Sequence, residues 1–304
     1  MIELTADCFQ EVCAAEPVRE QLGSLDSNRK AAVRKFWLCV VGGLVLAGAA
    51  WLTLSRAGWP TACWILALVF GIGGFIAGYA AISSVAAGLK VPVLETIAKR
   101  AGMDYAAGGF SPPVYPVARQ ALFGGWLSSE SFSDLFHGAD EDGRGYAVYE
   151  ATLQRRSGKN THTIFTGQIY ALERRPGGQG TTVIVPDRGI FNFFKPGNGM
   201  ERVKLEMDEA FEKSFEVYST APLEAKQLLL DPMFRRRLLD LRQKSGRVLA
   251  FFDPENALVA VHGGNRFEPG SMFRSKGGEE RVKAMLDDFC AALAVLRELK
   301  ARLG

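Results

Sequence analysis

Two long uncharged stretches dominate the hydropathy pattern. The first runs from Phe36 to Ser55, and the second is most apolar from about Thr61 to Ile82. About 20 apolar residues in a helix cover ~30 Å, which is the thickness of the hydrocarbon core of a bilayer. Because backbone groups inside lipid must bond to one another, we expect a transmembrane helical hairpin within residues 36–89. A helical hairpin buried inside a soluble protein is the alternative.

Small residues recur at helical spacing in the second stretch. Gly71, Gly74 and Gly78 are three or four residues apart, and Gly74 and Gly78 form a GxxxG pair. Small side chains let helix backbones approach closely in a membrane. We expect these glycines to pack the two helices of the hairpin on each other, with homo-oligomerisation through the same face as the alternative. No ionisable residue marks a transport pathway between Thr61 and Ile82.

The first 35 residues form an electrically divided arm. Phe9, Val12 and Cys13 are spaced as on one face of a short amphipathic helix, which Pro17 breaks or kinks. Acidic residues dominate up to Asp26, whereas 27–35 holds four bases and no acid. We expect the bases to face anionic lipid and the acidic helix to dock onto protein, either the same chain or a partner.

Residues 90–304 carry the pattern of a mixed domain. Alternating, β-branched and aromatic runs predict strands, and longer periodic runs predict helices. Strands in succession with helices kept apart indicate an α+β domain on an antiparallel sheet. Glycine- and proline-rich segments over 106–116 and 138–145 are expected to be loops. The expected strands are 146–153, 161–172, 181–185, 203–207, 215–219, 248–252 and 258–261, and the expected helices are 223–244 and 279–303.

The distribution of charge predicts the topology. The chain has 36 basic and 33 acidic residues, but a single charge, Arg56, lies between Lys35 and Lys90. Basic residues flank the cytoplasmic ends of membrane helices. We therefore expect a bacterial inner (plasma) membrane protein with both termini and the main domain in the cytoplasm. A net charge of +3 argues against a nucleic-acid binder that depends on gross basicity.

Several short strings resemble one family. They comprise Phe215–Tyr218 with Glu224-Ala225 and Leu230–Phe234, the strand motifs Ile164–Gly167 and Thr182–Pro186, and Phe267–Pro269. This set resembles an uncharacterised bacterial membrane-protein family that has a two-helix N-terminal anchor and a cytoplasmic domain of unknown function. Gln168 and the polar segment 139–145 depart from the pattern. The resemblance implies a fold and a location but no catalytic residues.

The sequence contains no recognisable catalytic, metal or cofactor motif. His137, His162 and His262 lack metal-ligand spacing with one another or with cysteine, and none accompanies a nucleophile motif. There are five cysteines, an odd number, and they are irregularly spaced, so they indicate neither a disulfide framework nor a zinc site. We expect no cofactor and no enzymatic activity, with an unrecognised enzyme as the remaining option.

The most suggestive basic patch lies in the predicted helix 223–244. Arg235, Arg236 and Arg237 are consecutive, and Arg242 follows one and a half turns later. Bases near a membrane surface attract anionic lipid by roughly 1 kcal/mol each, although bases in the last turns of a helix also complement its dipole. Two functions remain open: a scaffold that binds a protein partner or a second copy, and a sensor of anionic lipid or a phospho-ligand at these arginines.

Overall fold

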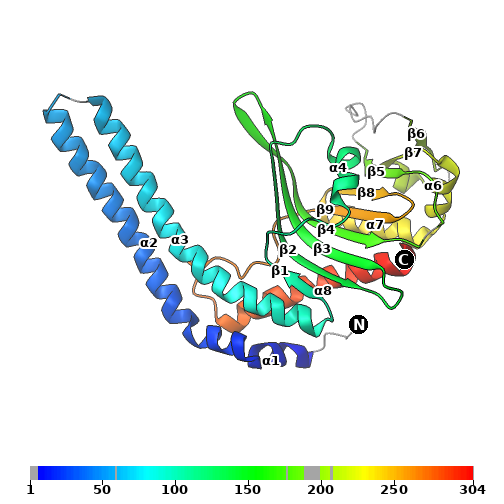
Figure 1. The fold of residues 1–304 in the computed structure, drawn as a ribbon, viewed down its shortest axis with the longest axis horizontal. Helices are drawn as coiled ribbons and strands as arrows, with labels where there is room; N and C mark the ends of the chain where they lie inside the picture. The colour runs from blue at the N-terminus through cyan, green and yellow to red at the C-terminus, as the bar shows by residue number, and fades with distance from the viewer. Residues whose placement is uncertain (1–5, 59, 176, 188–198, 206–207, 304) are drawn as a thin grey trace. The chain divides into compact units, whose positions relative to one another are not determined.

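The computed structural model describes residues 6–58, 60–175, 177–187, 199–205 and 208–303, which form two compact units (Figure 1). The helical unit holds the chain up to Ile97 together with Phe267–Asp288. The sheet unit holds Ala98–Arg266 and Phe289–Gly304. Residues 267–288 thus group with the N-terminal helices, although they lie inside the range 90–304 expected to form one domain.

Two long helices build the helical unit. After the short helix α1 (Ala6–Ala14), helix α2 covers Glu16–Arg56 and helix α3 covers Pro60–Arg100. Pro17 occupies the first turn of α2, where its missing N–H has no helical partner to lose. Both helices contain stretches long and apolar enough to cross a membrane, and they continue well beyond the expected spans 36–55 and 61–82.

The segment 267–288 packs on these helices through apolar side chains, and a buried arginine bonds its loop internally. Met272 packs in one cluster with Phe36 and Ile82, and helix α8 (Gly278–Leu303) follows it in the chain. Arg281 in the first turns of α8 is 1% exposed and donates to the backbone carbonyls of Pro269, Ser271 and Arg274. Burial lowers the pKa of Arg281. The guanidinium therefore holds the 269–274 loop in shape.

The sheet unit is built on one nine-stranded antiparallel sheet. Its strand order is β1-β2-β3-β4-β9-β8-β5-β7-β6. The expected α+β class with an antiparallel sheet is confirmed. The strands are β1 (Asp104–Ala106), β2 (Ser129–Ala139), β3 (Gly145–Ser157), β4 (Asn160–Glu173), β5 (Thr182–Pro186), β6 (Glu201–Val203), β7 (Phe215–Ser219), β8 (Val248–Phe252) and β9 (Asn256–His262).

Helices cover both faces of this sheet. On one face α4 (Tyr115–Phe123) packs over side chains such as Tyr149 and Ile169. On the other face, aromatic pairs join the sheet to α7 and α8: Phe234 lies 6.0 Å from Phe252, and Phe289 lies 4.9 Å from Phe136. Successive residues of a strand therefore serve two apolar layers, which is why these strands read as nearly continuous hydrophobic runs.

Three sequence expectations need correction. The single helix expected over 223–244 is two helices, α6 (Pro222–Leu228) and α7 (Pro232–Ser245). Pro232 cannot continue a helix from the preceding residues, and the Asp231 side chain caps the new helix by accepting from the Met233 N–H at 2.8 Å. Strands β1 and β2 and helix α4 were not expected at all, and β2 ends inside the segment 138–145 that was expected to be a loop. Of the strand expected over 203–207, the structure has β6 ending at Val203, and residues 206–207 lie outside the described chain.

Gln168, which departs from the family pattern, is buried on a central strand of this sheet. It is 4% exposed, stands opposite Glu150 of β3, and accepts a hydrogen bond from the Tyr170 hydroxyl at 2.8 Å. A polar side chain on an inner face needs such partners. Gln168 is therefore a buried interior residue, and it lies on a central strand between β3 and β9.

Candidate functional site

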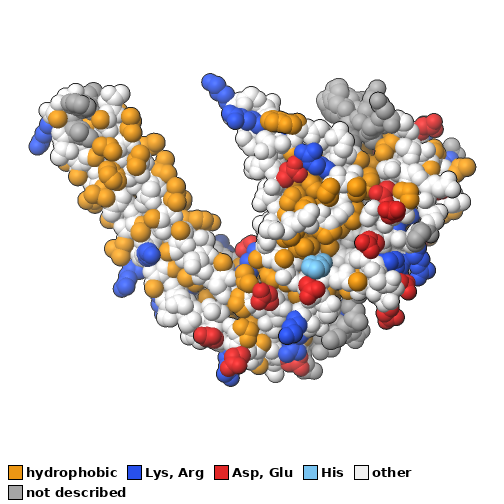
Figure 2. All heavy atoms as spheres, viewed as in Figure 1, with side chains coloured by type: hydrophobic (Ala, Val, Ile, Leu, Met, Phe, Trp, Pro, Cys, Tyr) orange, Lys and Arg blue, Asp and Glu red, His pale blue; other side chains and the backbone are white. Residues whose placement is uncertain are grey.

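A cleft of about 480 Å³ opens on the α4 face of the sheet. It lies where the ends of β2 and β4 and the starts of β3 and β9 meet the 111–114 loop. Figure 2 shows apolar side chains gathered over the strands of the sheet unit, with charged side chains and a histidine at the border. The lining residues include Ser111, Pro113, Val114, Leu135, His137, Tyr146, Ala147, Ala171, Glu173 and Asn256.

Small side chains in register create the floor of the cleft. Ala147 of β3 is paired with Ala171 of β4, and on its other side it is paired with His137 of β2. The next inward-facing pair along the same two strands is Tyr149 and Ile169, whose large side chains fill the core. Two alanines followed by two large residues leave a hollow at this end of the sheet, with apolar walls.

The rim of the cleft is polar. Glu173 at the end of β4 stands opposite Asn256 of β9, and its carboxylate accepts a hydrogen bond from the Gly145 N–H at 2.6 Å. His137 is half-buried on the opposite side. An apolar floor with a carboxylate, an amide and an imidazole at the mouth suits a ligand that has an apolar body and a hydrogen-bond donor at one end.

The loop 111–114 that forms the cleft wall is hydrogen-bonded to a buried side chain of the sheet. The buried Tyr149 hydroxyl donates to the Pro113 carbonyl at 2.8 Å, and burial raises the pKa of Tyr149 well above its usual value. Val114 has φ 61°, a left-handed conformation that costs a β-branched residue on the order of 1–3 kcal/mol. The loop expected from sequence as a simple connector is thus a constrained wall of the cleft.

Replacing Tyr149 with phenylalanine is expected to loosen this wall. The substitution removes the bond to the Pro113 carbonyl and leaves the ring packing, so it should cost about 1 kcal/mol of unfolding free energy. Hydrogen exchange should rise in residues 110–116. Tyr218→Phe is the matched control, because its hydroxyl donates instead to Glu216 at 2.9 Å. Equal exchange at 110–116 in the two variants would contradict the role given to Tyr149.

In the structure, the arginines expected to form one basic patch have separate partners and differ in exposure. Arg235 is 8% exposed and pairs with Asp208 at 2.8 Å. Arg237 pairs with Glu298 at 2.6 Å, and Arg242 lies over the Phe215 ring at 5.2 Å from its centroid. Arg236 is exposed and pairs with Asp240 one turn later at 3.2 Å. All four therefore have contacts inside the sheet unit, and their contact with an anionic ligand stays a prediction.

The three glycines expected to pack the helical hairpin differ in whether they contact the other helix. A Cβ at Gly74 would lie 2.4 Å from the Cys39 carbonyl oxygen, and one at Gly78 would lie 3.0 Å from the Phe36 backbone. A Cβ at Gly71 would meet nothing within 4 Å. Gly43 of α2, which is not among the glycines expected to pack the hairpin, faces Gly74 across the contact, and a Cβ there would lie 2.5 Å from the Phe70 carbonyl oxygen. At Gly43, Gly74 and Gly78 the backbones of α2 and α3 thus approach each other closely.

The sequence predicts no cleft, and the absence of metal-ligand spacing or a nucleophile motif gave His137 no functional role. His162 is exposed on β4 and His262 ends β9, so of the three histidines it is His137 that lines the cleft. The pairing of Ala147 with Ala171 depends on strand register, which a single sequence does not reveal. The glycine-proline segment over 106–116 was the available signal, because such loops beside strand ends often carry function.

Comparisons with known proteins give a resemblance to a family of unknown function and no activity. No curated protein matches this chain. The crystal structure of the mycobacterial trehalose monomycolate transport factor A (TtfA) is similar over 68% of this chain and 96% of that chain, at 14% identity and a TM-score of 0.33. Residues 163–301, from β4 to near the end of α8, match the family described as "Protein of unknown function (DUF3137)", so the resemblance to an uncharacterised family is confirmed over those residues.

Proposed function

We propose that this protein is a membrane-anchored binding protein that uses the cleft on its sheet unit to hold a segment of a protein partner. Helices α2 and α3 anchor it in the bacterial inner membrane, and the sheet unit lies in the cytoplasm. The uncharged spans flanked by Arg34, Lys35 and Lys90 support this topology. The cleft over Ala147 and Ala171 is the observation that carries the binding role.

The geometry of the cleft favours a particular kind of segment. A volume of about 480 Å³ accommodates one or two aliphatic side chains over the alanine floor. The carboxylate of Glu173 at the mouth favours a basic side chain or a free N–H next to them. We therefore propose an extended partner segment that combines an aliphatic residue with a neighbouring lysine or arginine.

Site-specific photo-crosslinking of the full-length protein in bacterial cells tests this function. A benzophenone amino acid at Ser111, on the cleft wall, is expected to give a discrete crosslinked product. The same probe at Lys159, an exposed residue in the turn between β3 and β4, is the control and should not give that product. The absence of a distinct product at Ser111 would overturn the proposed function.

Two further variants separate the cleft from the rest of the surface. Ala147→Leu fills the hollow and is expected to abolish the Ser111 product. Glu173→Gln keeps the side-chain shape and an acceptor for the Gly145 N–H, so the fold should persist while the yield falls several-fold. A product that survives both variants unchanged would show that the partner contacts a surface other than this cleft.

A further inference from the structure

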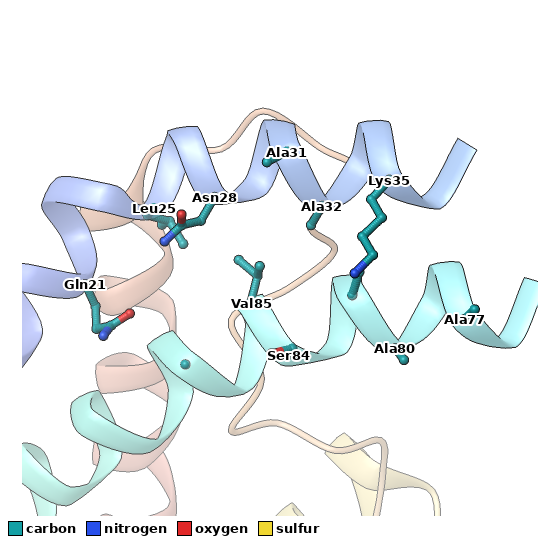
Figure 3. A pocket seen from close by; sticks show the side chains of 12 residues that line it. Gln21, Leu25, Asn28, Ala31, Ala32, Lys35, Ala77, Ala80, Ser84 and Val85 are labelled. Atoms are coloured by element: carbon teal, nitrogen blue, oxygen red, sulfur yellow. The ribbon is translucent and has the colours of Figure 1, made fainter. Parts of the chain in front are cut away.

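A second depression lies in the helical unit, between α2 and α3. It has a volume of about 600 Å³ and is lined by twelve residues, none of them acidic (Figure 3). On the α3 side, the small side chains of Ala77, Ala80 and Ser84 leave the space of the groove open. The α2 side contributes Ala31, Ala32 and longer polar side chains. The two helices touch at Gly74 and Gly78, so the groove opens on the cytoplasmic side of that contact, past Gly78 in α3.

One lining residue carries a positive charge into this groove. The side chain of Lys35 extends from α2 toward α3 across the opening, as Figure 3 shows. Within the described chain Lys35 forms no ion pair. Asp26, the nearest acid along α2, is already occupied by Arg29 at 2.9 Å and Lys30 at 2.6 Å. The groove therefore has an unneutralised cation and no carboxylate in its lining, which is complementary to an anion.

The polarity of the groove changes along its length. Ala77, Ala80 and Ala81 lie at the inner end of the predicted span that finishes near Ile82. Gln21 and Asn28 lie farther toward the N-terminus of α2, beyond the expected start of its span at Phe36. From Ala77 to Gly88 the helix rises about 16 Å, which is on the scale of a glycerophosphate headgroup with the first carbons of its acyl chains. One end thus matches acyl chains and the other matches a polar headgroup.

We propose that this groove seats one anionic phospholipid of the inner leaflet, with its phosphate at Lys35 and its proximal acyl carbons over the alanines. The inference rests on the proposed insertion of α2 and α3, which puts lipid directly against the open side of the groove. Gln21, Asn28 and Ser84 supply hydrogen-bonding groups for the glycerol and the headgroup. The seat differs from general attraction to basic residues because it needs both the cation and the hollow.

Photo-labelling of the full-length protein in lipid vesicles tests the seat. The vesicles contain a small, equal fraction of either phosphatidylglycerol or phosphatidylcholine with a diazirine near the start of one acyl chain. Labelling of peptides that cover 77–88 is expected to be several-fold higher with phosphatidylglycerol. Co-flotation of the protein with the vesicles is measured first. A chain that does not float would overturn the membrane anchor and the lipid seat together, whereas a chain that floats without lipid preference would overturn the seat alone.

Matched variants distinguish the seat from surface charge. Lys35→Gln should reduce the preference for phosphatidylglycerol to near one, and Ala80→Leu should lower labelling by filling the groove. Arg34→Gln and Ala87→Leu are the controls, since both positions are exposed and neither lines the groove. If Arg34→Gln and Lys35→Gln reduced the preference equally, the attraction would be a property of the basic segment and the proposed seat would be wrong.

Discussion

Replacing Arg235 with alanine is expected to lower the unfolding free energy of the sheet unit by about 3 kcal/mol, the largest effect we expect from a single substitution. Its guanidinium donates to the carbonyls of Leu229 and Leu230 and pairs with Asp208 at 2.8 Å. Alanine leaves these acceptors without their donor in a site where Arg235 is 8% exposed. The adjacent Arg236→Ala should change stability by less than about 0.5 kcal/mol, because that side chain is exposed.

Denaturant unfolding of the two alanine variants, followed by circular dichroism, measures this difference. The two substitutions are chemically identical and one residue apart, so changes in helix propensity cancel between them. Equal losses in the two variants would contradict the buried role of Arg235. The result would also separate the structural arginine from the one that a ligand can reach.

The stabilisation of the fold by Arg235 should decrease at acidic pH. The hydrogen bond from Arg235 is the main reason that the pKa of Asp208 lies below its usual value. A carboxyl whose pKa is lowered by folding stabilises the folded state fully above its unfolded pKa of about 3.9 and loses this contribution as the pH falls through the folded pKa. The stability gap between the native chain and Arg235→Ala should therefore be constant from pH 7 to about 5 and shrink below about 4.

Replacing Gly74 with alanine is expected to weaken the packing of α2 on α3 by about 2 kcal/mol. The added methyl would lie 2.4 Å from the Cys39 carbonyl oxygen and 3.2 Å from the Gly43 Cα. Both neighbours are backbone atoms, so the helices themselves must separate to relieve the contact. Gly73→Ala adds the same methyl one residue away, where nothing lies within 4 Å. That control should leave the packing intact.

Titration of the detergent-solubilised protein with sodium dodecyl sulfate can measure helix-pair packing. The rings of Trp51 on α2 and Trp64 on α3 are 4.5 Å apart, so their fluorescence reports separation of the helices. The midpoint should fall for Gly74→Ala and stay unchanged for Gly73→Ala. A Trp51→Phe background identifies the part of the signal that comes from this pair. Equal midpoints for the two glycine variants would contradict the close contact.

At several sites, strand or helix register and the partners of side chains could not be predicted from the sequence. Arg235, Arg236 and Arg237 are equivalent in the sequence, yet one is buried, one is exposed and one pairs with Glu298 from a distant part of the chain. Gly71 and Gly74 have the same residue type and both lie on the helical repeat, but Gly74 alone of the two meets a backbone. A helix presents several faces, and the face that meets a neighbour depends on how the neighbour packs.

The sequence by itself determined the features that depend on local composition and periodicity. These are the two long apolar helices, the charge-divided arm before them, most of the strands, and the α+β class of the remaining chain. Each follows from the physical chemistry of one segment, such as the hydropathy of a 20-residue run or the alternation along a strand. The break at Pro232 also has a local cause that the sequence carries.

Tertiary structure alone decided the sites. The cleft exists because Ala147 and Ala171, 24 positions apart in the chain, are paired across β3 and β4 beneath the 111–114 loop. The groove at Lys35 exists because α2 and α3 touch at Gly74 and Gly78 and leave a hollow past that contact. Both are spaces between segments, and a space has no signature in either segment alone. Hydropathy reports whether a residue is buried, whereas packing decides what it is buried against.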